Sequence, residues 1–153
     1  MNDLKEKAYI FGMIFMLSNK LQILGDKTDP LLTVKQWLLL AGVLRCESNA
    51  PTLSEIAAQI GSSRQNVKKT ASILARAGYV LMNKDADDAR VLRISLTNTC
   101  LEHLKKRDKM EQRFLEKLFA GFAPEELSLL SQAIQKLEEN LTGLEQSYEE
   151  VEA

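Results

Sequence analysis

The chain has 153 residues, the size of one compact domain with extended helical arms, and its 45% apolar content is ordinary for a globular protein. A formal net charge of −1 would argue against a nucleic-acid-binding protein if the charges were evenly spread. They are uneven: residues 61–107 hold ten basic against four acidic residues, whereas residues 108–153 hold four against eleven. The basic middle is therefore the segment expected to meet an anionic partner.

The residue types give little support to an enzyme or a metalloprotein. Cys46 and Cys100 are far apart in the sequence, so reduced thiols in the cytoplasm are expected rather than a disulfide framework. Cys100 and His103 have the spacing of half a zinc site, but His103 is the only histidine, and a pair on a helix surface is favoured. A redox role for Cys46 needs a basic neighbour that lowers its pKa, and Arg45 is the only one visible in the sequence. With no nucleophile motif and no phosphate-binding glycine loop, we predict a protein that is not an enzyme and has no metal and no cofactor.

Residues 4–24 form the first predicted helix, because large apolar residues recur there at steps of three and four. So much apolar surface on one helix needs more than one partner to cover it. The segment Ala8–Leu17 is long enough for a signal-peptide core, but Asp3 and Glu6 precede it and no small-residue cleavage site follows. It is also too short to span a bilayer. We therefore expect a cytoplasmic protein that has no membrane partner.

A second helix is predicted to begin after Thr33. The Thr33 hydroxyl can cap this helix, and the Gln36 side chain can accept a hydrogen bond from the Thr33 backbone N–H. The residues expected to pack inward are Val34, Trp37, Leu38, Ala41 and Leu44. Four bulky residues of the first two helices either line a ligand pocket or fill the core, and the core is favoured: Tyr9, Met13, Met16 and Trp37.

Residues 52–78 carry the pattern of a helix-turn-helix. Thr52 and Glu55 form a capping-box signature, and Gly61 is placed to end that helix, because a left-handed cap costs glycine no side-chain clash. Ser63 can cap the following helix, and Gly78 closes it. The buried residues are expected at helical spacing: Leu53, Ile56, Ala57 and Ile60, then Val67, Ala71, Leu74 and Ala75.

The polar face of the second helix predicts contacts with DNA. Arginine can pair with guanine, glutamine or asparagine with adenine, and lysine with guanine or phosphate. A helix N-terminus also favours phosphate through its free N–H groups. The DNA-contacting residues predicted here are Ser62, Ser63, Arg64, Gln65, Asn66, Lys68 and Lys69. A merely solvated charged face is the competing interpretation, and the neighbouring turn and hairpin favour DNA.

A β-hairpin, here called the wing, is predicted over residues 79–96, with strands at 79–84 and 90–96. Asp88 lies two residues before Arg90, so its carboxylate can hold the guanidinium in a fixed pose. An oriented arginine suits a narrow minor groove, where the negative potential is strongest. Lys84, Asp88 and Arg90 therefore complete the predicted DNA-binding set. A loose polar loop is the alternative.

These elements resemble the DNA-binding core of the MarR family of bacterial transcription regulators. The resemblance is carried by Leu53-Ser54-Glu55-Ile56-Ala57, by the serine-led second helix with Leu74 and Gly78, by Asp88-Ala89-Arg90, and by Leu96-Thr97 before a long helix. Order and length agree over nearly the whole chain, but the sharp motifs lie within residues 53–97. Thr99-Cys100 departs from a position where the family often has glycine, and the uncommon Gln65-Asn66 pair leaves the operator sequence open.

The C-terminal third predicts two long helices. Thr97 caps a helix that runs to about Phe119, and Pro124 occupies a permitted first-turn position of the next. The last helix carries a heptad pattern at Leu127, Leu130, Ile134, Leu137, Leu141, Leu144, Tyr148 and Val151. Such a seam requires a second helix, either within the chain or from another copy, and the resemblance implies a two-fold dimer. The predicted dimerisation residues are Ile10, Ile14, Leu17, Leu130, Ile134, Leu137, Leu141 and Leu144.

The sequence thus predicts a mainly α protein with a two- or three-stranded β wing. Its expected parts are an N-terminal dimerisation helix (1–30), a winged helix-turn-helix (31–97) and long C-terminal helices that complete the dimerisation region (98–153). We predict a homodimeric transcriptional repressor that binds an inverted repeat in double-stranded DNA. The resemblance implies release by a small phenolic or other apolar compound, or by oxidation. A helical dimeric adaptor whose winged unit binds protein is the alternative.

Overall fold

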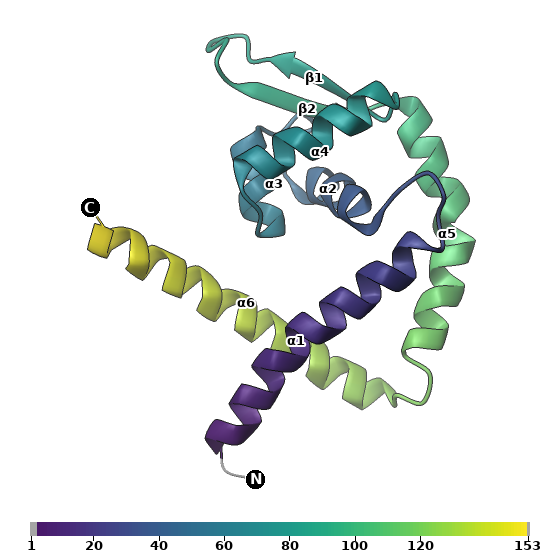
Figure 1. Cartoon of the computed structure of the whole chain (residues 1–153), viewed down its shortest axis with the longest axis vertical. Helices are drawn as coiled ribbons and strands as arrows, with labels where there is room; N and C mark the ends of the chain where they lie inside the picture. The colour runs from purple at the N-terminus through teal and green to yellow at the C-terminus, as the bar shows by residue number, and fades with distance from the viewer. Residues whose placement is uncertain (1–2, 153) are drawn as a thin grey trace. The chain divides into compact units, whose positions relative to one another are not determined.

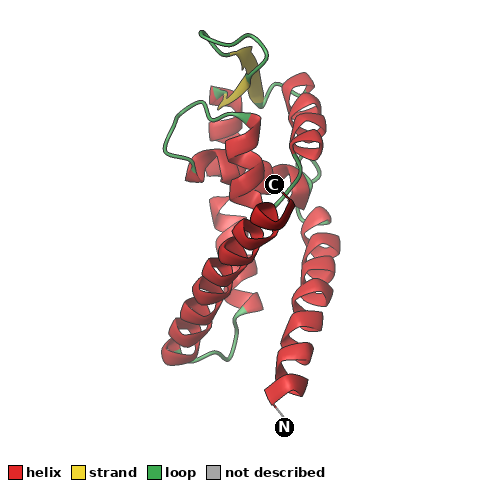
Figure 2. Cartoon of the chain, turned by 90° about the vertical axis from the view of Figure 1, so that its left-hand side faces the viewer, coloured by secondary structure: helices red, strands yellow, loops and turns green. Residues whose placement is uncertain are grey.

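The computed structural model describes the backbone of residues 3–152 and the side chains of residues 3–148. Within that range the chain forms six helices and a single two-stranded sheet (Figures 1 and 2). The elements are α1 (Asp3–Asp26), α2 (Val34–Arg45), α3 (Leu53–Ile60), α4 (Arg64–Arg76), β1 (Val80–Lys84), β2 (Leu92–Leu96), α5 (Asn98–Leu118) and α6 (Pro124–Glu152). The predicted fold class is confirmed. The chain divides into two compact units, Met1–Lys106 and Arg107–Ala153.

Helix starts in the first unit are set by the predicted caps. The Oγ1 atoms of Thr33 and Thr52 each accept a hydrogen bond from the third residue of the helix, and Gln36 and Glu55 complete the two capping boxes. Ser63 caps α4 by accepting from the Asn66 N–H at 3.1 Å. Each cap satisfies N–H groups that have no partner inside the helix, so the starts of these three helices are fixed locally by sequence.

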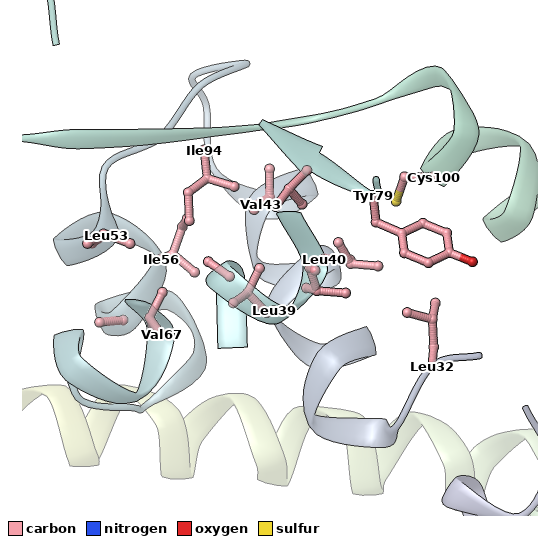
Figure 3. Close-up of a cluster of buried hydrophobic side chains, with 14 residues drawn as sticks. Leu32, Leu39, Leu40, Val43, Leu53, Ile56, Val67, Tyr79, Ile94 and Cys100 are labelled. Atoms are coloured by element: carbon pink, nitrogen blue, oxygen red, sulfur yellow. The ribbon is translucent and has the colours of Figure 1, made fainter. Parts of the chain in front are cut away.

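The core of the first unit joins α2, α3, α4, both strands and the start of α5. Figure 3 shows Leu39 and Leu40 of α2 in the middle of this cluster, with Ile56 and Val67 toward one end and Tyr79 toward the other. The buried apolar side chains are Leu32, Leu39, Leu40, Val43, Leu53, Ile56, Ala57, Val67, Ala71, Leu74, Tyr79, Val80, Ile94 and Cys100. The predicted inward stripes of α3 and α4 are therefore confirmed, except that Ile60 and Ala75 are only partly buried.

The predicted inward face of α2 was wrong. Leu39, Leu40 and Val43 are buried, whereas Leu38 is 40% and Leu44 is 60% exposed. The reason is that α2 contacts α1, α3, α4 and β2, and its apolar residues are spread around the helix instead of forming one stripe. An apolar helix surface that meets several neighbours cannot be oriented from spacing alone.

The wing is an antiparallel pair in which Val80 faces Leu96 and Lys84 faces Leu92. Thr52 adds a bridge to Arg93 on the other side of β2, and the Ile94 N–H donates to the Pro51 carbonyl at 2.9 Å. A third short extended segment therefore joins the base of the wing to the start of α3.

The large apolar side chains described for α1 and α6 are mostly exposed in the single chain. Among the residues whose side chains are described, neither helix contains a buried one, and the exposed fractions of the leucine and isoleucine side chains of the α6 seam lie between 37% for Leu127 and 60% for Leu141. The seam position Val151 lies outside the residues whose side chains are described. Ala8–Leu17 alone is too short to span a bilayer, but α1 as a whole is long and apolar enough to cross a membrane, with a mean hydropathy of 1.2 over an 18-residue window. The core helix of a soluble protein and a signal sequence meet the same criteria.

Candidate DNA-binding surface

Helix α4 separates an apolar face from a polar one. Val67, Ala71 and Leu74 are buried against the core. The predicted contact residues of the helix are exposed: Arg64, Gln65, Asn66, Lys68 and Lys69, with Ser63 at the N-cap. Asn66 and Lys69 also line a pocket shared with α1 and α2. The side chains that can bind bases and phosphates are therefore presented by a helix whose orientation is fixed from behind.

The turn between α3 and α4 depends on Gly61. Its φ of +65° is left-handed, and a Cβ placed there would meet no atom within 4 Å. Glycine is therefore needed for its backbone conformation rather than for space. The Ser62 N–H then donates to the Ala57 carbonyl at 3.0 Å, which closes the turn and sets the direction in which α4 leaves.

At the wing tip Asp88 holds Arg90, as predicted. The Arg90 Nε and Nη2 groups donate to the two carboxylate oxygens of Asp88, each at 3.1 Å, and the Arg90 backbone N–H donates to Oδ1 at 3.0 Å. The guanidinium lowers the pKa of the Asp88 carboxyl below its ordinary value, with the Arg90 N–H as the next cause. The Arg90 side chain is nevertheless 90% exposed, so it is oriented and still open to a ligand.

The sequence did not single out Arg93, which forms the second ion pair of the wing. Its Nε donates to Asp85 Oδ1, and its Nη1 donates to the Ala50 carbonyl at 3.0 Å. That hydrogen bond from Arg93 is the main cause that lowers the pKa of Asp85, followed by those from the Asp87 and Asp88 N–H groups. The sequence offered one signal for this ion pair, which is a basic residue on the second strand of a hairpin whose loop is acidic.

The ten predicted DNA-binding residues fall into two groups. Seven lie on the α3–α4 turn and the first two turns of α4: Ser62, Ser63, Arg64, Gln65, Asn66, Lys68 and Lys69. Three lie on the wing: Lys84 at the end of β1, and Asp88 and Arg90 in the loop. The two groups belong to one compact unit, and the shared core and the bridge at Thr52 connect them.

A pocket of about 720 Å³ lies beside α4 in the same unit. Its walls come from Leu17 and Leu21 of α1, Leu38 of α2 and Ile73 of α4, and Lys35 and Lys69 supply cationic groups. Among the described residues that line it, none is acidic. The pocket is therefore mostly apolar, with positive charge and one wall formed by the helix that presents Arg64.

The four bulky residues assigned to the core are outside it. Tyr9 is 63% and Met16 is 54% exposed, and Met13 and Trp37 are only partly buried. They are also absent from the described wall of the pocket. Three of them lie on α1, whose side chains are all at least partly exposed in the single chain.

The surroundings of Cys46, Cys100 and His103 indicate structural roles for these residues. Cys100 is fully buried, so the predicted surface pair with His103 is wrong. His103 Nε2 lies 2.9 Å from Asp29 Oδ2 instead, and its ring packs edge-on against Tyr79. Burial raises the thiol pKa of both cysteines, and for Cys46 the charge of Glu55 adds to the effect. A raised pKa keeps a thiol protonated and disfavours redox sensing.

Comparisons with known proteins agree with this architecture. No protein-family model matches the chain. The transcriptional repressor MprA of Escherichia coli (strain K12) is 28% identical over 100 residues, which cover 65% of this chain and 57% of MprA. The chain thus matches a little over half the length of that curated relative.

Solved structures match over more of the chain. A MarR protein from Peptoclostridium difficile DA00132 is 25% identical, with a TM-score of 0.76 and 86% of each chain covered. BpsR of Bordetella bronchiseptica, whose DNA binding is described as regulated by 6-hydroxynicotinic acid, has a TM-score of 0.73 at 15% identity, covering 84% of this chain and 98% of BpsR. These relatives are regulators rather than enzymes, in agreement with the prediction.

Proposed function

We propose that this chain, which shares the fold and sequence motifs of MarR family transcriptional regulators, is a cytoplasmic DNA-binding repressor that acts as a homodimer. One observation carries the proposal. Helix α4 exposes arginine, amide and lysine side chains along one face, while Val67, Ala71 and Leu74 fix the opposite face in the core. This is the arrangement in which a helix can enter a major groove and bind base edges.

The uncovered apolar residues of α1 and α6 support the dimer. A heptad seam on an exposed helix is stable when a second helix covers it, and a second copy of the chain supplies two such helices. The proposed interface contains Ile10, Ile14 and Leu17 of α1 together with Leu130, Ile134, Leu137, Leu141 and Leu144 of α6. Two copies of α4 related by a two-fold axis would meet major-groove faces about 34–36 Å apart, so the operator should be an inverted repeat.

Selection of bound duplexes from a random pool tests the proposal. We expect enrichment of an inverted repeat whose half-sites are centred about 10 base pairs apart or a multiple of that distance. The Arg64→Ala variant should lose the enriched sequence, whereas Lys27→Ala, which removes an exposed charge on the α1–α2 connection, should retain it. Recovery of no preferred sequence by the wild-type chain would instead favour the adaptor alternative.

We also propose that the pocket beside α4 receives a small apolar or phenolic effector. A ligand there would touch α1 and α4 together, so it could favour a conformation with a different placement of α4. The regulation of BpsR by 6-hydroxynicotinic acid gives a precedent for this type of signal. The raised pKa of both thiols favours a small molecule over an oxidant.

A matched pair of tryptophan substitutions tests the effector site. Leu38→Trp would fill the pocket, while Leu31→Trp adds the same bulk at an exposed position away from its described wall. In a thermal-shift screen of phenols and aromatic acids, a compound that stabilises the wild type and Leu31→Trp should not stabilise Leu38→Trp. Equal stabilisation of all three proteins would place the ligand elsewhere.

A further inference from the structure

We propose that Asp85 and Arg93 are positioning residues that hold the wing-tip Arg90 in register with α4 when the protein is on DNA. The inference rests on the proposed function and extends it to two residues that need not touch DNA. Its basis is a continuous series of hydrogen bonds that runs from the start of α3 to the Arg90 guanidinium.

The first link ties the wing to the helix-turn-helix. Arg93 projects from β2 and donates through Nη1 to the Ala50 carbonyl, just before α3. The backbone of the same residue forms the bridge with Thr52, which is the N-cap of α3. Arg93 therefore connects the strand to the segment from which α3 starts, by both its main chain and its side chain.

The second link passes from Arg93 to the loop through Asp85. Arg93 Nε donates to Asp85 Oδ1, and Asp85 Oδ2 accepts from the Asp87 and Asp88 N–H groups at 3.1 Å each. The Asp85 N–H donates to the Val91 carbonyl at 2.8 Å, which closes the loop. The Asp85 carboxylate thus fixes the loop backbone at Asp87 and Asp88.

The third link is the pair at the tip. Asp88 accepts three hydrogen bonds from Arg90, so the position of the Asp88 backbone decides where the guanidinium points. Arg90 has no packed neighbours to hold it, since its side chain is 90% exposed. Loss of the Asp85–Arg93 pair would release the loop while leaving Arg90 itself intact.

The direction in which DNA affinity changes when the Asp85 charge is removed distinguishes a positioning role from long-range electrostatics. Asp85 is an acidic residue in a loop expected to lie near phosphates, so removal of its charge should tighten DNA binding if only long-range repulsion mattered. If Asp85 holds the loop in place, the same change should weaken binding instead. Asp87 is a matched control, because it lies in the same loop with an exposed side chain that is not part of this series of hydrogen bonds.

The experiment compares Asp85→Asn and Asp87→Asn in the full-length protein on a selected duplex. We expect Asp85→Asn to weaken affinity by about 3–10-fold, as for loss of one typical hydrogen bond, and Asp87→Asn to leave it unchanged or slightly tighter. In an Arg90→Ala background, Asp85→Asn should have no further effect, because the residue being positioned is gone. Arg93→Gln should also weaken binding, but it removes a positive charge as well, so Asp85→Asn is the variant that decides between positioning and electrostatics.

Hydrogen–deuterium exchange of the 85–91 amides provides a second readout, in which Asp85→Asn should exchange faster than Asp87→Asn. Equal affinities for the two asparagine variants, or additive losses with Arg90→Ala, would overturn the inference even when the wild type binds DNA well. Failure of the wild type to bind any duplex would refute the proposed function and the inference with it. Faster exchange in Asp85→Asn would then show only that the link orders the loop.

Discussion

At the scale of single residues, DNA recognition is expected to divide between base contacts on α4 and an oriented arginine on the wing. Arg64 is the first residue of α4 and is exposed, in the position from which a recognition helix reaches base edges. Arg90 is exposed but already held by Asp88, so less side-chain entropy is lost when it binds. The two arginines should therefore differ in how their loss affects specificity.

The Arg64→Ala substitution should cost about 1–3 kcal/mol at the preferred duplex and relax the preference at one base position. The reason is that a paired contact with a base edge is lost, while the phosphate contacts remain. Fluorescence anisotropy with the preferred duplex and with single-base variants measures this effect, and Lys27→Ala serves as the control. Equal weakening on every duplex would identify Arg64 as a phosphate contact.

The pKa of Asp85 gives a pH-dependent prediction. Its pKa is lowered from the ordinary value of 3.8 in the folded protein, chiefly by Arg93, so its contribution to stability is present above pH 3.8 and is lost as the pH falls through the lower folded pKa. In Arg93→Gln the titration midpoint should rise toward 3.8. Carbon-13 NMR of the Asp85 carboxyl measures the midpoint, and an identical value in both proteins would contradict the role given to Arg93.

At the scale of elements, the sequence predicted the local signals well and the orientation of apolar faces less well. The capping boxes at Thr33 and Thr52 and the left-handed Gly61 were predictable because each depends on neighbouring residues only. The face of α2 was not predictable, because several elements pack around it. Arg93 was missed for a similar reason: its partner Ala50 is 43 residues away, and it contributes a backbone carbonyl that no side-chain pattern reveals.

The turn between α3 and α4 gives a prediction at this scale. Gly61→Ala should destabilise the first unit by about 1–2 kcal/mol, because a side chain at a φ of +65° is strained. Gly143→Ala in α6 is a matched control that should be neutral or stabilising, since alanine is favoured inside a helix. Urea unfolding of both variants tests the pair, and a neutral Gly61→Ala would show that the turn tolerates another conformation.

At the scale of the whole molecule, the charge pattern and the exposed seam favour an assembly of two copies. The basic middle of the chain contains α4 and the wing, while the acidic residues concentrate after residue 107, so net charge near zero conceals a strongly uneven distribution. The position of the acidic excess, in the segment that contains α6, keeps it on a different element from the proposed DNA contacts.

The Ile134→Glu substitution should convert the dimer to a monomer. It would place an unpaired charge in the proposed seam, at a cost of about 3–5 kcal/mol if the position is buried between copies. Gln135→Glu adds the same charge one residue later, outside the heptad pattern, and should leave the dimer intact. Sedimentation velocity measures the result, and a wild-type monomer would show that the seam is covered in another way.

The most direct test of DNA recognition by α4 is the salt dependence of binding to the selected duplex. We predict that log affinity falls linearly with log salt concentration, with a slope of roughly −0.9 for each phosphate contacted, and that the Lys68→Ala/Lys69→Ala double variant has a shallower slope. A wild-type affinity that does not change with salt, or a double variant with the wild-type slope, would contradict a DNA-binding role for this face of the helix.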